Sequence, residues 1–163
     1  FSASKTGAEF ISLHTCAGMK ALKMAKDAAN EGAAQVNLIP PKLLGITVLT
    51  SWTQEDLVAD LSIDQSIDIR VKHLAMIASN AKLDGCVCSP REVKFLREIY
   101  PDSFQLVTPG IRLHGSEVND QSRISDAFEA IKMGASKLVI GRAITQSRDP
   151  ASMFKTFCDN VSF

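Results

Sequence analysis

The chain has 163 residues, of which 45% are hydrophobic and 22% are charged; this composition and length fit one globular domain over 1–163. Eighteen basic residues balance eighteen acidic ones, so the charge does not favour a nucleic-acid-binding protein. The sequence has no apolar run of the ~18 residues that a membrane span needs, and no opening signal of basic then apolar residues. These features predict a cytoplasmic protein that acts on a small molecule, with neither nucleic acid nor membrane as partner.

The four cysteines, Cys16, Cys86, Cys88 and Cys158, comprise one Cys-x-Cys pair and two distant single positions. This spacing matches neither a zinc site nor a thioredoxin-type redox motif. We therefore expect free, buried thiols in a reducing compartment, and no metal.

The expected elements alternate between short strands and longer helices. Ser2 to Thr6, followed by Gly7, has the pattern of a last helical turn and its C-terminal glycine, so the chain is expected to begin inside an element. Apolar runs predict strands over 9–14, 42–49, 84–89, 104–108 and 137–142. Helical periodicity and capping signals predict helices over 17–31, from 53, over 67–82, 89–100 and 125–133, and from 149 onwards.

Capping residues mark several of these boundaries. Thr53 is an expected N-cap because acidic residues follow it in the first turn. Ser89 and Glu92 form an expected capping box, with Pro90 at the first helical position. Gly32 is expected just after the end of the helix that begins near residue 17.

Alternation of strand and helix predicts an α/β fold with a parallel sheet, right-handed crossovers and both sheet faces covered. A doubly wound sheet and a (β/α)8 barrel both satisfy this pattern. No strand is followed by G-x-G-x-x-G, which argues against the dinucleotide-binding variant.

Functional residues are expected just beyond the strand ends, because parallel α/β folds place their working loops there. The sequence VIGRAITQS puts Gly141 and Arg142 after the last strand, where an amide and a guanidinium can hold a phosphate. The segment 109–121 is long for a loop in a compact domain, and its Arg112 and Gln121 can close over the same ligand. His14, at another strand end, fits a core or rim residue better than a catalyst.

Several motifs resemble one family. LVTPGIR, GSEVNDQ and KLVIGRAITQSRDP are similar to the seventh and eighth strand–loop units of orotidine 5′-phosphate decarboxylase. GITVLTS and LDGCVCSPREV resemble its fifth and sixth strands, and ISLHT resembles its fourth. The resemblance extends over nearly the whole chain in the same order. It implies the (β/α)8 TIM barrel family, here as an incomplete barrel of about five βα units.

The resemblance also implies roles for individual residues. Arg142, the backbone of Gly141 and Gln121 match the residues that hold the nucleotide 5′-phosphate. Arg112 matches an arginine of the loop that covers the ligand, and Thr50 matches a residue that contacts the nucleotide. The implied reaction converts orotidine 5′-monophosphate to UMP in de novo pyrimidine biosynthesis without a metal or organic cofactor. Members of the family are homodimers, so a homodimer is expected.

One family motif is missing from the sequence. The reacting centre of the family is an Asp-x-Lys-x-x-Asp motif on the third strand, which this sequence lacks, with a further lysine and aspartate on the first two strands. Phe1 corresponds to a point just after the motif, so the catalytic lysine and aspartates are expected upstream of residue 1. The motif lysine stabilises and protonates the carbanion left after CO2 departs. We therefore expect the isolated chain to lack decarboxylase activity.

Two alternatives stay open on the sequence alone. One is a non-catalytic nucleotide- or phosphate-binding remnant. The other is a different phosphate-binding barrel decarboxylase acting on a sugar phosphate, which fits the I-G-R element but not the T-P-G-I-R and D-Q loop. Under any of these readings five strands cannot close an eight-stranded barrel, so unpaired strand edges, a partly exposed interior and self-association are expected.

Overall fold

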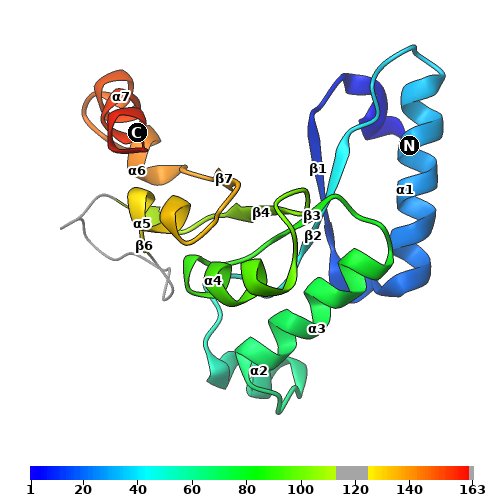
Figure 1. The fold of residues 1–163 in the computed structure, drawn as a ribbon, viewed down its shortest axis with the longest axis horizontal. Helices are drawn as coiled ribbons and strands as arrows, with labels where there is room; N and C mark the ends of the chain where they lie inside the picture. The colour runs from blue at the N-terminus through cyan, green and yellow to red at the C-terminus, as the bar shows by residue number, and fades with distance from the viewer. Residues whose placement is uncertain (113–124, 162–163) are drawn as a thin grey trace.

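The computed structural model describes residues 1–112 and 125–161 of the chain (Figure 1). The strands of the described part are β1 (Phe10–His14), β2 (Lys42–Ile46), β3 (Gly85–Val87), β4 (Gln105–Thr108), β5 (Ile111–Arg112), β6 (Ser125–Asp126) and β7 (Lys137–Leu138). Its α-helices are α1 (Gly18–Ala34), α2 (Gln54–Leu61), α3 (Ile67–Asn80), α4 (Pro90–Ile99), α5 (Ala127–Lys132), α6 (Arg142–Thr145) and α7 (Pro150–Val161). Short 3-10 turns, η1 (Ser2–Thr6) and η2 (Thr15–Ala17), flank β1.

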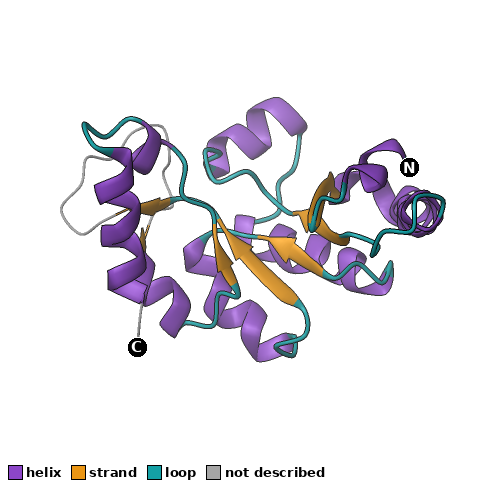
Figure 2. Cartoon of the chain, turned by 90° about the horizontal axis from the view of Figure 1, so that it is seen from above, coloured by secondary structure: helices purple, strands orange, loops and turns teal. Residues whose placement is uncertain are grey.

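Five strands form one parallel sheet in the order β1-β2-β3-β4-β7, which confirms the parallel α/β prediction. The spatial order follows the chain without reversal, so successive right-handed crossovers place their helices on the same face of the sheet. A doubly wound sheet would reverse its strand order and cover both faces. The topology is therefore that of a barrel segment, and α1 and α7 lie at opposite ends of the molecule's long axis (Figures 1 and 2).

The face away from these helices is open, contrary to the expectation that both faces would be covered. Phe10, Leu44, Val87 and Val107, one from each of the four neighbouring strands β1 to β4, line a groove of about 400 Å³ on this face. In a closed barrel such side chains fill the interior. Here Phe10 and Val87 are half-buried, and Leu44 and Val107 are buried. As predicted, β1 and β7 each have a neighbour on one side only within the sheet.

The hydrophobic core lies between the sheet and its helices. Leu22 of α1, Leu74 of α3 and Leu96 of α4 are buried there against Leu43 and Leu106 of the strands. None of the helices in the described residues is both long and apolar enough to cross a membrane.

Several element boundaries differ from those expected. Strand β2 ends at Ile46 and not at Leu49, and β7 is limited to Lys137–Leu138, so Arg142 begins a helix. Helix α1 continues through Gly32 to Ala34. Gly32 has a packing role, because a Cβ at this position would lie 2.5 Å from the carbonyl oxygen of Phe1.

The predicted N-cap residues Thr53 and Ser89 are confirmed, whereas the prediction that Gly32 follows the end of its helix is wrong. Thr53 accepts a hydrogen bond from the amide of Asp56, whose carboxylate accepts one from the Thr53 amide at 2.7 Å. The Glu92 carboxylate likewise accepts from the Ser89 amide at 2.7 Å, with Pro90 opening α4. Asp126 caps α5, which therefore begins two residues later than predicted.

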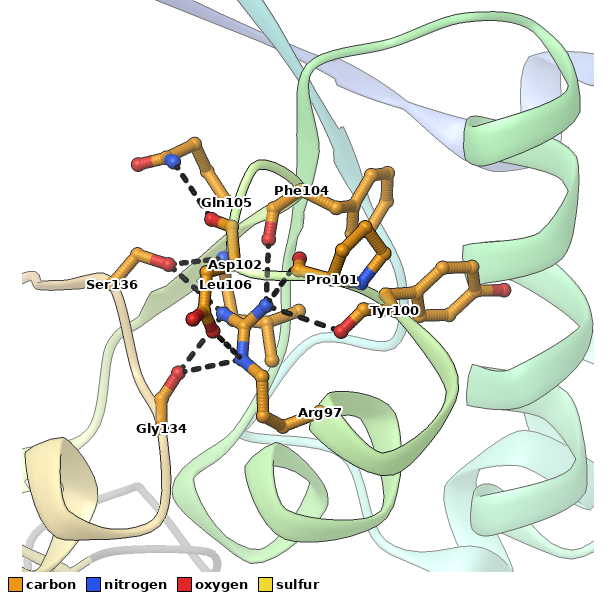
Figure 3. A network of polar contacts seen from close by, with 9 residues as sticks. All are labelled: Arg97, Tyr100, Pro101, Asp102, Phe104, Gln105, Leu106, Gly134 and Ser136. Carbon is orange, nitrogen blue, oxygen red and sulfur yellow. Dashed lines mark hydrogen bonds and ion pairs between the residues drawn. The ribbon is translucent and has the colours of Figure 1, made fainter.

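Arg97 joins the elements at the amino rim of the sheet, the rim where the strands begin (Figure 3). Its guanidinium donates to the carbonyl oxygens of Pro101, Phe104 and Gly134 at 2.6, 3.1 and 2.9 Å, and to the Ser136 hydroxyl at 3.0 Å. Phe104 precedes β4 and Ser136 precedes β7. The Arg97 cluster, meaning Arg97 with these four partners, therefore sets how α4 meets the starts of two neighbouring strands.

All four cysteines are free thiols, as predicted. Cys86 and Cys88 are buried, but Cys158 is half-buried and Cys16 is exposed, so burial was wrongly predicted for Cys16. Cys16 lies in the turn after β1, outside the layer between sheet and helices. A hydrogen bond with Cys86, burial and the nearby Glu92 charge together raise the pKa of Cys88 well above its ordinary value.

Candidate functional site

The candidate residues lie at the carboxyl rim, the rim formed by the C-terminal ends of the parallel strands. Arg112 follows β4, and the Gly141-Arg142 pair follows β7. Strands β4 and β7 are paired neighbours, with Thr108 opposite Leu138 in the register. Both arginines therefore leave adjacent strands at the same rim, as a shared ligand would require.

A short second sheet holds Arg112. Residues Ile111 and Arg112 of β5 pair in parallel with Ser125 and Asp126 of β6, an arrangement that the sequence did not predict. The Arg112 side chain is buried, with 7% of its surface exposed. Its Nη1 donates to the carbonyl oxygen of Ile111 at 2.8 Å.

Arg112 makes no ion pair with a carboxylate among residues 1–112 and 125–161. A guanidinium has five N–H donors, and burying them without acceptors is costly. Within the described ranges, the Ile111 carbonyl oxygen is the acceptor that the Arg112 guanidinium contacts.

Gly141 and Arg142 open helix α6. Gly141 is the N-cap residue, and the carbonyl oxygen of Gly141 accepts hydrogen bonds from Ile144 and Thr145 at 2.9 and 3.0 Å. A Cβ built on Gly141 would meet no described atom within 4 Å, so the backbone here is open to an approaching group. Arg142 is exposed at the first position of the helix.

The other candidates are placed less centrally. Thr50 is buried at the carboxyl rim, in the loop after β2, and β3 separates its strand from β4. His14 ends β1 as an exposed rim residue. The Thr15 side chain points toward the helices. A Cβ added to Gly45 would lie 2.5 Å from the Thr15 hydroxyl and 2.9 Å from the Cβ of Ala78 in α3, so both groups lie on that side of the strand. Gln121 lies outside the described residues.

This arrangement suits binding of a phosphate more directly than bond-breaking. Two guanidinium groups and an open backbone can hold a dianion, because arginine matches phosphate oxygens in charge and geometry. Within the described ranges, no three histidine, cysteine, aspartate or glutamate side chains gather as a metal would need. Both arginines lie after strands, as the sequence predicts, but nothing in the sequence pattern indicates the β5–β6 pair that contains Arg112.

Comparisons with known proteins agree with this geometry. Residues 2–157 match the model of the orotidine 5′-phosphate decarboxylase / HUMPS family. The chain is 77% identical over 162 residues to the orotidine 5′-phosphate decarboxylase of Prochlorococcus marinus strain NATL1A. The alignment covers 99% of this chain and 67% of that protein, so the chain spans about two thirds of the length of such relatives.

Solved structures support the same assignment. The crystal structure of orotidine 5′-phosphate decarboxylase from Lactobacillus acidophilus superposes with a TM-score of 0.85 at 32% identity, covering 99% of this chain and 66% of that one. The Pyrococcus horikoshii enzyme of the same name, at 17% identity and a TM-score of 0.62, covers 98% of this chain and 65% of that one and supports the fold alone. Proteins of this name are carbon–carbon lyases of pyrimidine biosynthesis. The extent of the match over 2–157 and the 77% identity place the chain in the orotidine 5′-phosphate decarboxylase / HUMPS family.

Proposed function

We propose that this chain forms the phosphate-binding side of an active site that decarboxylates orotidine 5′-monophosphate to UMP. The observation that carries the proposal is the buried Arg112, which has no carboxylate partner in the described residues. It follows β4, and β4 pairs with β7, the strand that leads to Arg142. In this role Arg112, Arg142 and the Gly141 backbone bind the 5′-phosphate. Gln121 and Thr50 complete the nucleotide contacts.

Phosphate binding contributes to catalysis because binding energy from a remote group can hold the reacting ring in position. The sequence contains no Asp-x-Lys-x-x-Asp motif, so these 163 residues do not supply the lysine that would protonate the carbanion. The 163-residue chain by itself is therefore expected to bind UMP without converting orotidine 5′-monophosphate.

Calorimetric titration with UMP tests the binding role. Replacing Arg142 with alanine removes charge-assisted hydrogen bonds worth about 2 kcal/mol, so UMP affinity should fall about 30-fold. Arg91→Ala removes another exposed arginine, from the first turn of α4, and is the matched control; it should leave affinity unchanged. Equal affinities of all three proteins would contradict the proposal.

Complementation tests the catalytic role. The chain is mixed with a separately expressed segment that carries the Asp-x-Lys-x-x-Asp motif, and UMP formation is followed. Activity in the mixture, with none in either part alone, is expected. A non-catalytic nucleotide-binding remnant would bind UMP in the first experiment but stay inactive in the mixture, whereas turnover by the 163-residue chain alone would refute the expected division of roles.

The open sheet supports two finer proposals. Unpaired strand edges and exposed apolar side chains favour association, so the protein is proposed to act as a homodimer, which light scattering would show as twice the monomer mass. Four free thiols fit a reducing compartment, and the cytoplasm is the proposed location.

A further inference from the structure

A second cavity lies at the carboxyl rim, on the side of the sheet that the helices cover. It occupies about 320 Å³ between the ends of β1 and β2 and the helices α2 and α3. Trp52, Leu57 and Leu74 line it, and Leu49 and Leu61 stand at its mouth. The phosphate-binding role assigned above uses neither the cavity nor these residues.

The cavity is lined almost entirely by apolar groups and is accessible from solvent. Leu57 is 1% exposed and forms its floor, whereas Leu49 and Leu61 are 41% and 47% exposed. Exposed aliphatic side chains around a pocket mark a surface where an apolar group gains by leaving water. The lining therefore selects a ligand with an apolar body.

Arg70, from α3, is the charged residue of the lining. Its guanidinium forms no ion pair or side-chain hydrogen bond with any residue in the two described ranges, although acidic residues flank the cavity in sequence at Asp64 and Asp68. Arg97 contrasts with it, because protein oxygens surround that guanidinium. An unpaired guanidinium at an apolar pocket complements an anionic group attached to an apolar body.

We propose that this cavity binds a small apolar carboxylate, with its hydrocarbon part against Trp52 and Leu57 and its carboxylate on Arg70. The cavity volume lies at the lower end of the range for small-molecule sites, which limits the ligand to about ten non-hydrogen atoms. Octanoate has this size and chemistry. The cavity contains none of the proposed phosphate-binding residues, so this proposal can be tested separately from the proposed function.

Trp52 allows a direct test, because it is the single tryptophan of the chain and it lines the cavity. Its fluorescence is followed during titration with octanoate and, in parallel, with the neutral 1-octanol, both below their aggregation limits. We expect the fluorescence to change and reach saturation with octanoate. The affinity for octanoate should be at least tenfold higher than that for octanol. Arg70→Gln should lower octanoate affinity about tenfold or more and leave octanol affinity unchanged, since it removes a charge and keeps the apolar walls.

Arg91→Gln is the matched control and should bind octanoate with the same affinity as the original protein. Far-ultraviolet circular dichroism verifies that Arg70→Gln remains folded, and a second variant, Leu61→Asp, should abolish binding of both ligands by charging the mouth. Absence of saturation, or equal affinity for octanoate in the original protein and Arg70→Gln, would overturn the proposal. So would a Trp52 emission that changes with protein concentration alone, in step with sedimentation, because a second copy of the chain would then fill the cavity.

Discussion

Arg97 and Arg112 lie near the two ends of strand β4, and their guanidinium groups have very different surroundings. At the amino rim, Arg97 donates to the oxygens of Pro101, Phe104, Gly134 and Ser136 (Figure 3). At the carboxyl rim, Arg112 is buried and donates to the neighbouring Ile111 carbonyl oxygen.

The difference teaches how to separate a structural arginine from a ligand-binding one. A guanidinium whose donors are filled by the chain stabilises the fold and has little left for an anion. A buried guanidinium whose donors are mostly unfilled by described residues costs stability unless an anion binds. In barrels of this kind conservation at the amino rim relates to stability and the carboxyl rim carries function, so we expect Arg97 to be structural and Arg112 to bind a ligand.

The largest effect is expected from Arg97→Ala. The substitution leaves the Phe104 and Gly134 carbonyl oxygens without their donor, so the free energy of unfolding should fall by about 4 kcal/mol. Urea unfolding followed by circular dichroism measures the change. Arg97→Lys keeps the positive charge but lacks the planar guanidinium with its several donors, so its unfolding free energy should lie between those of Arg97→Ala and the original protein. A value equal to that of the original protein would show that charge alone matters.

Two glycines extend the comparison. A Cβ on Gly85 would overlap the carbonyl oxygen of Gln105 on the neighbouring strand, so Gly85→Ala should cost about 3 kcal/mol of unfolding free energy. Gly141→Ala should cost less than about 1 kcal/mol, because the space around it is open. It should nevertheless weaken UMP binding in calorimetry, since the methyl group would lie where the phosphate approaches.

Arg112→Ala should affect ligand binding more than stability, whereas Arg97→Ala should affect stability most. Its unfolding free energy without ligand should change by about 1 kcal/mol or less, while UMP affinity should fall by about 2 kcal/mol, or about 30-fold. Thermal unfolding with and without UMP measures both quantities in one experiment. A loss of stability as large as that of Arg97→Ala would mean that the residue is structural.

The smallest effect concerns pH. The raised pKa of Cys88 means that the folded thiol keeps its proton at a pH where the unfolded thiol, with a pKa near 9.0, has released it. Stability should therefore be intact below about pH 8.5 and fall as the pH rises further, by at most about 1.4 kcal/mol per pH unit for this group. Unfolding of Cys88→Ala between about pH 8 and 10 should show a shallower slope; an unchanged slope would assign the effect to other groups, such as Tyr100, whose pKa burial also raises.

The sequence predicts the order of strands and helices more accurately than the residues at which they end. Arg112 and Arg142 lie at the carboxyl rim, as expected for residues that follow parallel strands, and their ligand-binding role stays a prediction. The expected end of β2 is too late because the β-branched residues Thr47 and Val48 also suit a strand. Gly32 was expected at a helix end because glycine is common there. Its packing against Phe1 depends on how η1 folds back onto α1, which the local sequence does not show.

The sequence by itself determined the α/β alternation, the N-cap residues Thr53 and Ser89 and the family, because these depend on neighbours along the chain. The tertiary structure decided that all crossovers place their helices on one face, which distinguishes a barrel segment from a doubly wound sheet. It also decided which protein oxygens surround the Arg97 guanidinium. The hydrophobic pattern of a sequence does not indicate which oxygens an arginine will bind. The acceptors around Arg97 come from segments up to 39 residues away along the chain.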